Sequence, residues 1–167
     1  PMDDNFFSES ILELERSGCD FSHADRIIQS RSGGIDTVKR GDERVAFFRM
    51  PFRHQTMIVR RDVYNSIGLY SEQYTIASDY DSILKILLAG KVGVYIPKVD
   101  IRSLDGGISS NREKCVEEIP NVIYERYGRI LSLSREDCKD IYLRKPSFGL
   151  LLKILCIQDR RIRNSLL

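Results

Sequence analysis

The order of the predicted elements constrains the fold of this chain more than any other feature. Strand and helix patterns alternate up to about residue 110, whereas the residues that follow show helical patterns alone. Such an order predicts an α/β layer with a helical C-terminal extension, and we place the boundary between residues 1–112 and residues 113–167. A length of 167 residues allows one domain with a substantial core and is short for two.

Caps and breakers set the expected bounds of these elements. Strand patterns cover 20–29, 35–38, 55–59, 92–96 and 99–104, with a turn at Gly33-Gly34 and a break at Pro97. Helix patterns begin at Ser8 or Ser10, Asp62, Ser78, Asn111, Ser134 and Pro146-Ser147, and the first three end at Gly18, Gly68 and Gly90. We expect the helix from Asn111 to be interrupted near Pro120 and to reach Gly128. The helix from Pro146 is expected to be the last.

Charge and cysteine usage argue against several classes of function. The net charge is +2, which gives no general case for nucleic-acid binding. The four cysteines are widely spaced, whereas zinc ligands usually come in closely spaced pairs, so we expect reduced thiols in a cytoplasmic protein. No charged-then-apolar leader opens the chain, and we expect no secretion signal. The longest apolar stretch, Phe148 to Ile157, is too short for a membrane span of roughly 20 residues.

Two acids follow the helix cap at Ser78. Asp79 and Asp81 would suit the first turn of any helix, where the N–H groups and the dipole favour negative charge by about 0.3–1 kcal/mol each. The functional alternative makes one of them a general base that is held at a rigid helix start. Because the two positions diverge by about 200° around the helix, we expect one to be the base and the other to be structural.

Three further segments have both a structural and a functional interpretation. Asp3 and Asp4 are either two acids at a chain end or ligands of a hard divalent cation, since Mg²⁺ and Mn²⁺ prefer oxygen ligands. His54-Gln55, beside several arginines, is either a packing element or part of an anionic pocket. Asp105-Gly106-Gly107 is either a turn or a loop that closes over a phosphate-bearing ligand. Each signal is weak alone, and their order carries more information.

Taken in order, these segments resemble the motifs of family 2 glycosyltransferases. Met2–Phe7 is similar to the Asp-Asp segment of that family. Phe52–Tyr70 resembles the segment that leads into its acceptor site, with a His-Gln strand, an Arg-rich turn and a glycine close to an aromatic residue. Ile76–Leu84 resembles the segment that carries the catalytic base, and Gly106–Ser109 matches a loop of many bacterial members that build surface polysaccharides. The resemblance covers roughly residues 2–112.

The resemblance implies a partial GT-A fold, which is Rossmann-like with a mixed sheet, and an inverting sugar transfer in the synthesis of a surface polysaccharide or glycolipid. The donor would be a nucleoside-diphosphate sugar, and the acceptor a sugar or a polyprenyl-linked sugar. Asp79 would be the general base, although Ser78 stands where family members usually have an acid. Asp4, with Asp3 beside it, would hold Mg²⁺ or Mn²⁺. The implied acceptor- and phosphate-binding residues are His54, Gln55, Arg60, Asp81, Gly106 and Gly107.

One departure from the family pattern concerns the start of the chain. In the GT-A fold the nucleotide-binding βα units precede the Asp-Asp motif, whereas here only Pro1-Met2 does. We therefore expect this chain by itself to turn over no nucleotide sugar. A non-catalytic binding module derived from the GT-A fold is the alternative. A nucleotidyltransferase would also use metal-binding acids, but it fits the Ser78–Asp81 and His54-Gln55 segments less well.

The C-terminal residues combine an apolar stripe with positive charge. Phe148, Leu151, Leu152, Leu155 and Ile162 recur at helical spacing, and Lys153, Arg160 and Arg163 lie among them. This pattern is typical of an amphipathic helix on an anionic membrane surface, and it equally suits a helix that packs on its own domain. The membrane interpretation predicts a cytoplasmic protein with peripheral contact to the inner membrane face.

Overall fold

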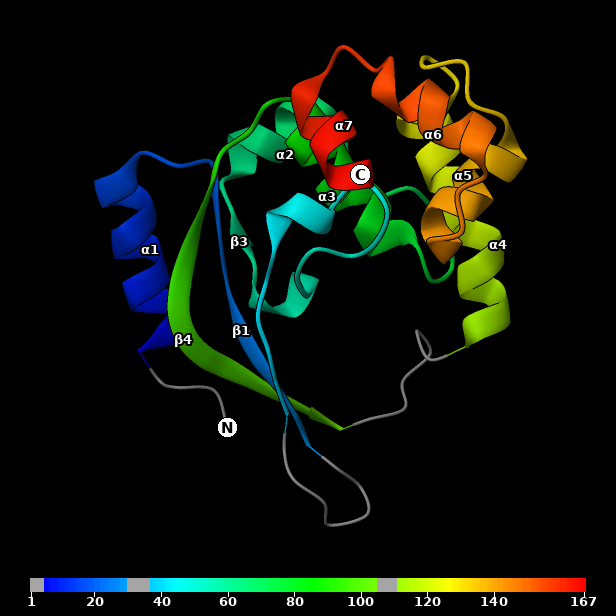
Figure 1. The fold of residues 1–167 in the computed structure, drawn as a ribbon. Coiled ribbons are helices and arrows are strands. Elements are labelled where there is room, and N and C mark those ends of the chain that lie inside the picture. Colours follow the sequence, from blue (N-terminus) through cyan, green and yellow to red (C-terminus); the bar gives the residue numbers. More distant parts are fainter. Residues whose placement is uncertain (1–4, 30–36, 105–110) are drawn as a thin grey trace. The chain divides into compact units, whose positions relative to one another are not determined.

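The protein forms two compact units, each built from segments that are far apart in the sequence (Figure 1). The computed structural model describes residues 5–29, 37–104 and 111–167. The first unit comprises 1–42, 52–69 and 85–107, and the second comprises 43–51, 70–84 and 108–167. The C-terminal helical residues therefore share a unit with two earlier segments of the chain.

A four-stranded mixed sheet forms the centre of the first unit. The strand β1 (Phe21–Gln29) runs parallel to β4 (Gly93–Leu104) along its whole length. On its other edge, β1 pairs antiparallel with β3 (Ile58–Val59) near its start and with β2 (Thr37–Lys39) near its end. The expected α/β class and the expected strand at 20–29 are thus confirmed. The predicted turn at Gly33-Gly34 lies outside the described residues.

Pro97 lies inside β4 and does not divide it, so the expected break between two strands is wrong. Ile96 is opposite Ala24 and Val99 is opposite Asp25, which leaves two residues of β4 in a bulge. A proline has no N–H group for the hydrogen-bond ladder, and a bulge removes the need for one at that position. A second register shift follows, because Arg26 is opposite Ile101, and the strand then pairs regularly with β1 up to Leu104.

Helix α1 (Phe6–Ser17) lies beside β4 and buries a narrow stripe of side chains, Phe6, Ser10 and Leu14 (Figure 1). Phe6 packs with Ala24 of β1 and Ile96 of β4. The helix begins after Asn5, so the expected start at Ser8 or Ser10 is wrong, because Ser10 belongs to the buried stripe and does not cap the helix.

The predicted end of α1 is confirmed. Gly18 adopts a left-handed conformation with φ of 67°, which a residue without a side chain reaches at no steric cost. Its backbone N–H donates to the carbonyl of Leu14.

The segment expected as a strand over 55–59 is mostly a turn. His54–Thr56 forms the short 3₁₀-helix η2, held by the N–H and the hydroxyl of Thr56, which both donate to the carbonyl of Arg53. Only Ile58–Val59 remains extended as β3. Helix α2 (Arg61–Ile67) follows and ends at Gly68, as expected, but its N-cap is Arg60 and not Asp62.

Helix α3 (Ser78–Leu88) begins at the predicted residue and buries the predicted apolar face. Tyr80 is also buried in its first turns and donates its hydroxyl hydrogen bond to the carbonyl of Ala46, close to the 3₁₀-helix η1 (Glu43–Val45). Burial raises the pKa of the Tyr80 phenol, so the group stays neutral and able to donate.

The second unit contains the C-terminal helices α4 (Arg112–Ile123), α5 (Arg135–Leu143), α6 (Phe148–Leu155) and α7 (Arg160–Leu166). Asn111 and Ser134 cap α4 and α5, as predicted, by accepting from N–H groups three residues later. Pro120 does not interrupt α4, and the geometry changes only at the π-helical segment η4 (Tyr124–Gly128). A proline inside a helix costs about 3 kcal/mol. Pro120 is buried here, as are Val122 and Ile123 of the same helix.

The apolar C-terminal stripe is divided between two helices, so α6 is not the last helix. Asp159 caps α7 and accepts from the N–H groups of Arg161 and Ile162 at 2.8 and 3.3 Å. Ile162 is buried, whereas Phe148 of α6 is exposed.

All four cysteines are free thiols. Among the helices in the described parts of the chain, none is long and apolar enough to cross a membrane.

Candidate functional site at the start of helix α3

The start of α3 is held by a carboxylate from another part of the second unit. Glu118 of α4 accepts hydrogen bonds from the backbone N–H groups of Thr75, Ile76 and Ala77, at 3.2, 2.7 and 2.9 Å. Partial burial opposes the charged form of Glu118, but the three N–H groups outweigh this effect and lower its pKa. The segment that carries the predicted base is therefore fixed in place immediately before the helix begins.

Asp81 turns into the protein and pairs with Arg126 of η4. Its carboxylate is 0% exposed, and it accepts from Nε and Nη2 of Arg126 at 2.5 and 3.0 Å. Such a two-point contact holds both groups in one orientation and compensates the burial of the charge. The resemblance implied an acceptor or phosphate contact for Asp81, whereas its observed partner is internal.

Asp79 has a different environment from Asp81, as the divergence of about 200° predicted. It is half-exposed in the first turn of α3, while Tyr80 and Asp81 after it are buried. Ser78 donates its hydroxyl to the carbonyl of Ser71 at 3.0 Å and so helps to anchor this turn. Of the two acids, Asp79 is the one that is accessible to solvent.

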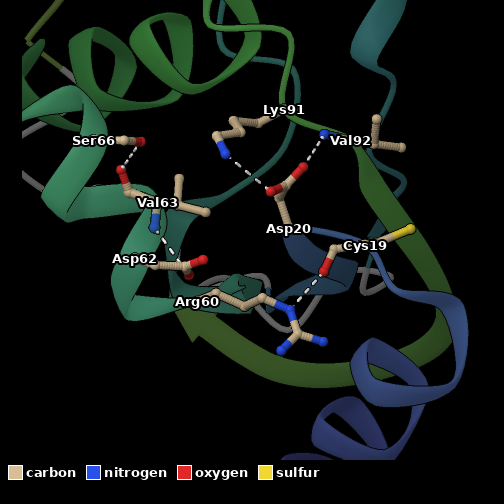
Figure 2. Close-up of polar contacts among 8 residues, drawn as sticks. All are labelled: Cys19, Asp20, Arg60, Asp62, Val63, Ser66, Lys91 and Val92. Atoms are coloured by element: carbon tan, nitrogen blue, oxygen red, sulfur yellow. Dashed lines mark hydrogen bonds and ion pairs between the residues drawn. The ribbon is translucent and has the colours of Figure 1, made fainter.

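Arg60, one of the implied phosphate-binding residues, is engaged with the end of α1. Its Nε donates to the carbonyl of Cys19 and its Nη2 to the carbonyl of Leu14, both at 2.8 Å. Figure 2 shows the guanidinium turned toward Cys19. The carbonyl of Leu14 also accepts from the N–H of Gly18, so Arg60 adds a second, charged donor at the helix C-terminus, where positive charge is favourable. Arg60 thus joins the segment before α2 to the end of α1.

Asp20 makes a second connection in the same region (Figure 2). Its carboxylate accepts from the N–H of Val92 at 2.9 Å and from Nζ of Lys91 at 3.2 Å. The hydrogen bond from Val92 is the main reason why the pKa of Asp20 is lowered, and Lys91 contributes further. This contact ties the start of β1 to the residues before β4.

The predicted site residues are distributed over both units. His54, Gln55 and Arg60 belong to the first, with His54 half-buried and Gln55 exposed in η2. Asp79 and Asp81 belong to the second unit. The remaining predicted residues, Asp3, Asp4, Gly106 and Gly107, lie outside the described residues. Within the described residues, no group of three or more His, Cys, Asp or Glu side chains could hold a metal ion.

A buried polar cluster on β1 was not singled out by the sequence analysis. His23 stacks on Phe52, with ring centroids 4.3 Å apart, and Asp25 accepts from the hydroxyl of Tyr95 at 2.7 Å. Burial and the contact with Asp25 raise the pKa of Tyr95. Arg40 approaches the same carboxylate at 3.9 Å. The sequence carries little signal for this burial, because polar residues at alternate positions are also the ordinary pattern of a strand with one face in water.

The chain was also compared with known proteins. No family model, no curated protein and no solved structure matches it.

Proposed function

We propose that this chain is part of an inverting glycosyltransferase of the family 2 type, with Asp79 as its general base. The observation that supports this role best is the separation of the two acids at the start of α3. Asp81 is engaged with Arg126 in the interior, whereas Asp79 is accessible in a turn that Glu118 holds from outside the helix. A general base needs both properties, access to substrate and a fixed position.

The proposed reaction is one displacement at the anomeric carbon of a nucleoside-diphosphate sugar. Asp79 takes the proton of an acceptor hydroxyl while that oxygen forms the new bond to the anomeric carbon. The bond to the donor phosphate breaks in the same step, and its electron pair leaves with the nucleoside diphosphate. Because attack and departure occur on opposite faces, the configuration is inverted. Holding the two reactants in line supplies much of the rate.

The other predicted partners remain part of this proposal. Asp3 and Asp4 would hold Mg²⁺ or Mn²⁺, which offsets negative charge on the leaving diphosphate. His54, Gln55, Gly106 and Gly107 are proposed to contact the acceptor or the phosphates. For Arg60 and Asp81 we propose structural roles, on the basis of their internal contacts.

The test is sugar transfer by the full-length gene product and its Asp79→Asn variant. Radiolabelled UDP-glucose, UDP-galactose, UDP-N-acetylglucosamine and GDP-mannose serve as donors, with a lipid extract of the source cells as acceptor. We expect Asp79→Asn to lower kcat by about 10²–10⁴-fold, the usual contribution of a general base, and to leave the KM for the donor near its original value.

Asp62→Asn is the matched control, because Asp62 is also an acid in the first turn of a helix and is exposed. This variant should retain the wild-type rate, and both variants should unfold at the wild-type temperature. If Asp79→Asn is as active as Asp62→Asn, Asp79 is not the base. A protein that binds a donor but transfers no sugar to any acceptor fraction would favour the non-catalytic module.

A further inference from the structure

We infer that a polar hollow in the second unit is a binding site for an uncharged carbohydrate. The hollow has a volume of about 520 Å³, which lies within the range of about 300–1,000 Å³ of small-molecule sites. Gln73 and Tyr74, in the segment before α3, line one part of it. The rest of the lining includes Asn121, Glu125, Arg126 and Arg135 from α4, η4 and the start of α5.

Both guanidinium groups that line the hollow are held in place before any ligand binds. Arg126 is fixed by its two hydrogen bonds to Asp81. Arg135 donates to Asn121 at 2.6 Å and to Glu125 at 3.0 Å, and its guanidinium lies 4.3 Å from the ring centre of Tyr124. Glu118 fixes the backbone immediately after Tyr74. Such preorganisation lowers the entropy that binding would otherwise cost.

The charges in and behind the lining are balanced, and this favours a neutral ligand over an anion. Two guanidinium groups, those of Arg126 and Arg135, each contact a carboxylate, Asp81 and Glu125 respectively. A phosphate or sulfate would gain little from these donors, because the paired carboxylate already offsets the positive charge of each guanidinium. A sugar hydroxyl can instead share them, because a guanidinium has five N–H donors and a carboxylate has about four acceptor positions.

The lining offers both the donors and the acceptors that a sugar ring requires. Gln73 supplies an amide N–H₂ and a carbonyl oxygen, and Glu125 supplies further acceptors. Asn121 already donates to the carbonyl of Glu117 and accepts from Arg135, and it offers its second amide N–H. Burial, and then the charge of Asp81, raise the pKa of Tyr74, which therefore remains a neutral hydroxyl that donates and accepts. Its ring adds a flat apolar surface of the kind on which the C–H face of a sugar can pack.

The inference goes beyond the proposed transferase reaction and does not depend on it. Asp79 is not among the lining residues, so the hollow can bind a sugar whether or not Asp79 acts as a base. Binding and turnover are measured separately, and failure of one leaves the other unaffected.

The test follows the ¹H–¹⁵N spectrum of the 167-residue chain as single sugars are added. D-glucose, D-galactose, D-mannose and N-acetyl-D-glucosamine are each titrated to about 100 mM, well above the ~1 mM dissociation constant of a weak specific site. We expect at least one of them to produce saturable shifts in the side-chain amide signals of Gln73 and Asn121. Tyr74→Phe removes one hydrogen-bonding group and should weaken this binding about three- to tenfold.

Tyr70→Phe is the matched control, because Tyr70 is an exposed tyrosine of the same segment that does not line the hollow. It should bind as the wild type does, and both variants should unfold at the wild-type temperature. Sodium sulfate is titrated in parallel. The inference is overturned if no sugar shifts these signals, if sulfate alone shifts them, or if Tyr74→Phe and Tyr70→Phe bind equally well.

Discussion

Asp79 and Asp81 illustrate how residues two positions apart can acquire different roles. Helix geometry alone turns them toward different surroundings. Which of the two is buried depends on Arg126, which is 45 residues later in the chain and pairs with Asp81. The sequence therefore predicts a division of roles between these two acids, while the tertiary contact decides which acid is structural.

The carboxylate of Glu118 should matter for stability as well as for the position of Asp79. We expect Glu118→Gln to lower the free energy of unfolding by about 1–2 kcal/mol at pH 7, because three N–H groups lose a charged acceptor. The folded-state pKa of Glu118 is lowered from 4.5, so its contribution is complete above that value and is lost as the pH falls through the lowered pKa. Urea unfolding should therefore show a smaller difference between wild type and variant at about pH 3 than at pH 7.

Glu117→Gln is the control for this measurement, since Glu117 is the preceding residue of α4 and its side chain is exposed. Its substitution should change the unfolding free energy by a few tenths of a kcal/mol at most. Equal losses in the two variants, or a loss in Glu118→Gln that does not depend on pH, would contradict the assigned role.

Gly128 is required by a close approach between η4 and α5. A Cβ atom at this position would lie 2.6 Å from Sγ of Cys138, which is fully buried. We expect Gly128→Ala to lower the free energy of unfolding by about 1–3 kcal/mol, the usual cost of overpacking, as measured by urea unfolding. Burial raises the pKa of the Cys138 thiol to about 12, so this residue is a neutral packing group at pH 7.

Gly149 in α6 is the control position for Gly128, because a Cβ atom there would have its nearest neighbour at 3.9 Å. Gly149→Ala should stabilise the protein by roughly 0.5–1 kcal/mol, because alanine is the better helix former. Adding Cys138→Ala to Gly128→Ala should recover part of the lost stability by freeing space. A double variant that is less stable than both single variants would show that the clash is not the cause.

At the scale of elements, α6 presents an exposed apolar stripe. Phe148, Leu152 and Leu155 are 78%, 49% and 54% exposed and lie at helical spacing, while Leu150 and Ile154 are buried on the opposite side. Lys145 precedes the helix, and Lys153 lies within it, with its Nζ 2.7 Å from a carboxylate oxygen of Asp137. Apolar side chains flanked by positive charge suit the surface of an anionic membrane, and we propose this peripheral contact for α6.

Substitutions on the stripe test this contact. Phe148→Ser combined with Leu152→Ser should weaken binding to phosphatidylglycerol-containing vesicles at least about tenfold, since each buried apolar side chain contributes roughly 1.5–3 kcal/mol. Vesicle sedimentation at low and at physiological salt provides the measurement.

Ile130→Ser is the control for the stripe, because Ile130 is 80% exposed and lies outside α6. It should leave vesicle binding unchanged. If the double variant and Ile130→Ser bind vesicles equally, or if the wild type does not bind at all, α6 is not a membrane contact.

Elements that are defined by local sequence signals, such as helix caps and apolar periodicity, were predicted well. The helices after Asn111 and Ser134 start as expected because each cap bonds to an N–H group three residues away. The helix from Ser78 follows its apolar pattern to Leu88, two residues before Gly90. The failures occur where a tertiary contact outweighs the local pattern. Pro97 is accommodated in a bulge opposite β1.

At the scale of the whole molecule, each unit is assembled from segments that are far apart in the sequence. The second unit contains 43–51 and 70–84 together with the C-terminal residues. Hydrogen bonds from two buried tyrosine hydroxyls connect these segments. Tyr80 donates to the carbonyl of Ala46, and Tyr127 donates to the carbonyl of Phe47. The predicted division into residues 1–112 and 113–167 follows the change in pattern, whereas the packing follows these long-range contacts.

The sequence by itself determined the α/β class, most helix bounds and the separation of Asp79 from Asp81, because local hydrogen bonds and periodicity depend only on neighbouring residues. Only the tertiary structure decided that Glu118 holds the start of α3, that Arg126 pairs with the buried Asp81, and that Gln73 and Tyr74 line a hollow together with Arg135. These partners are more than 40 residues apart along the chain. Their encounter depends on how the core packs, and no local pattern encodes it.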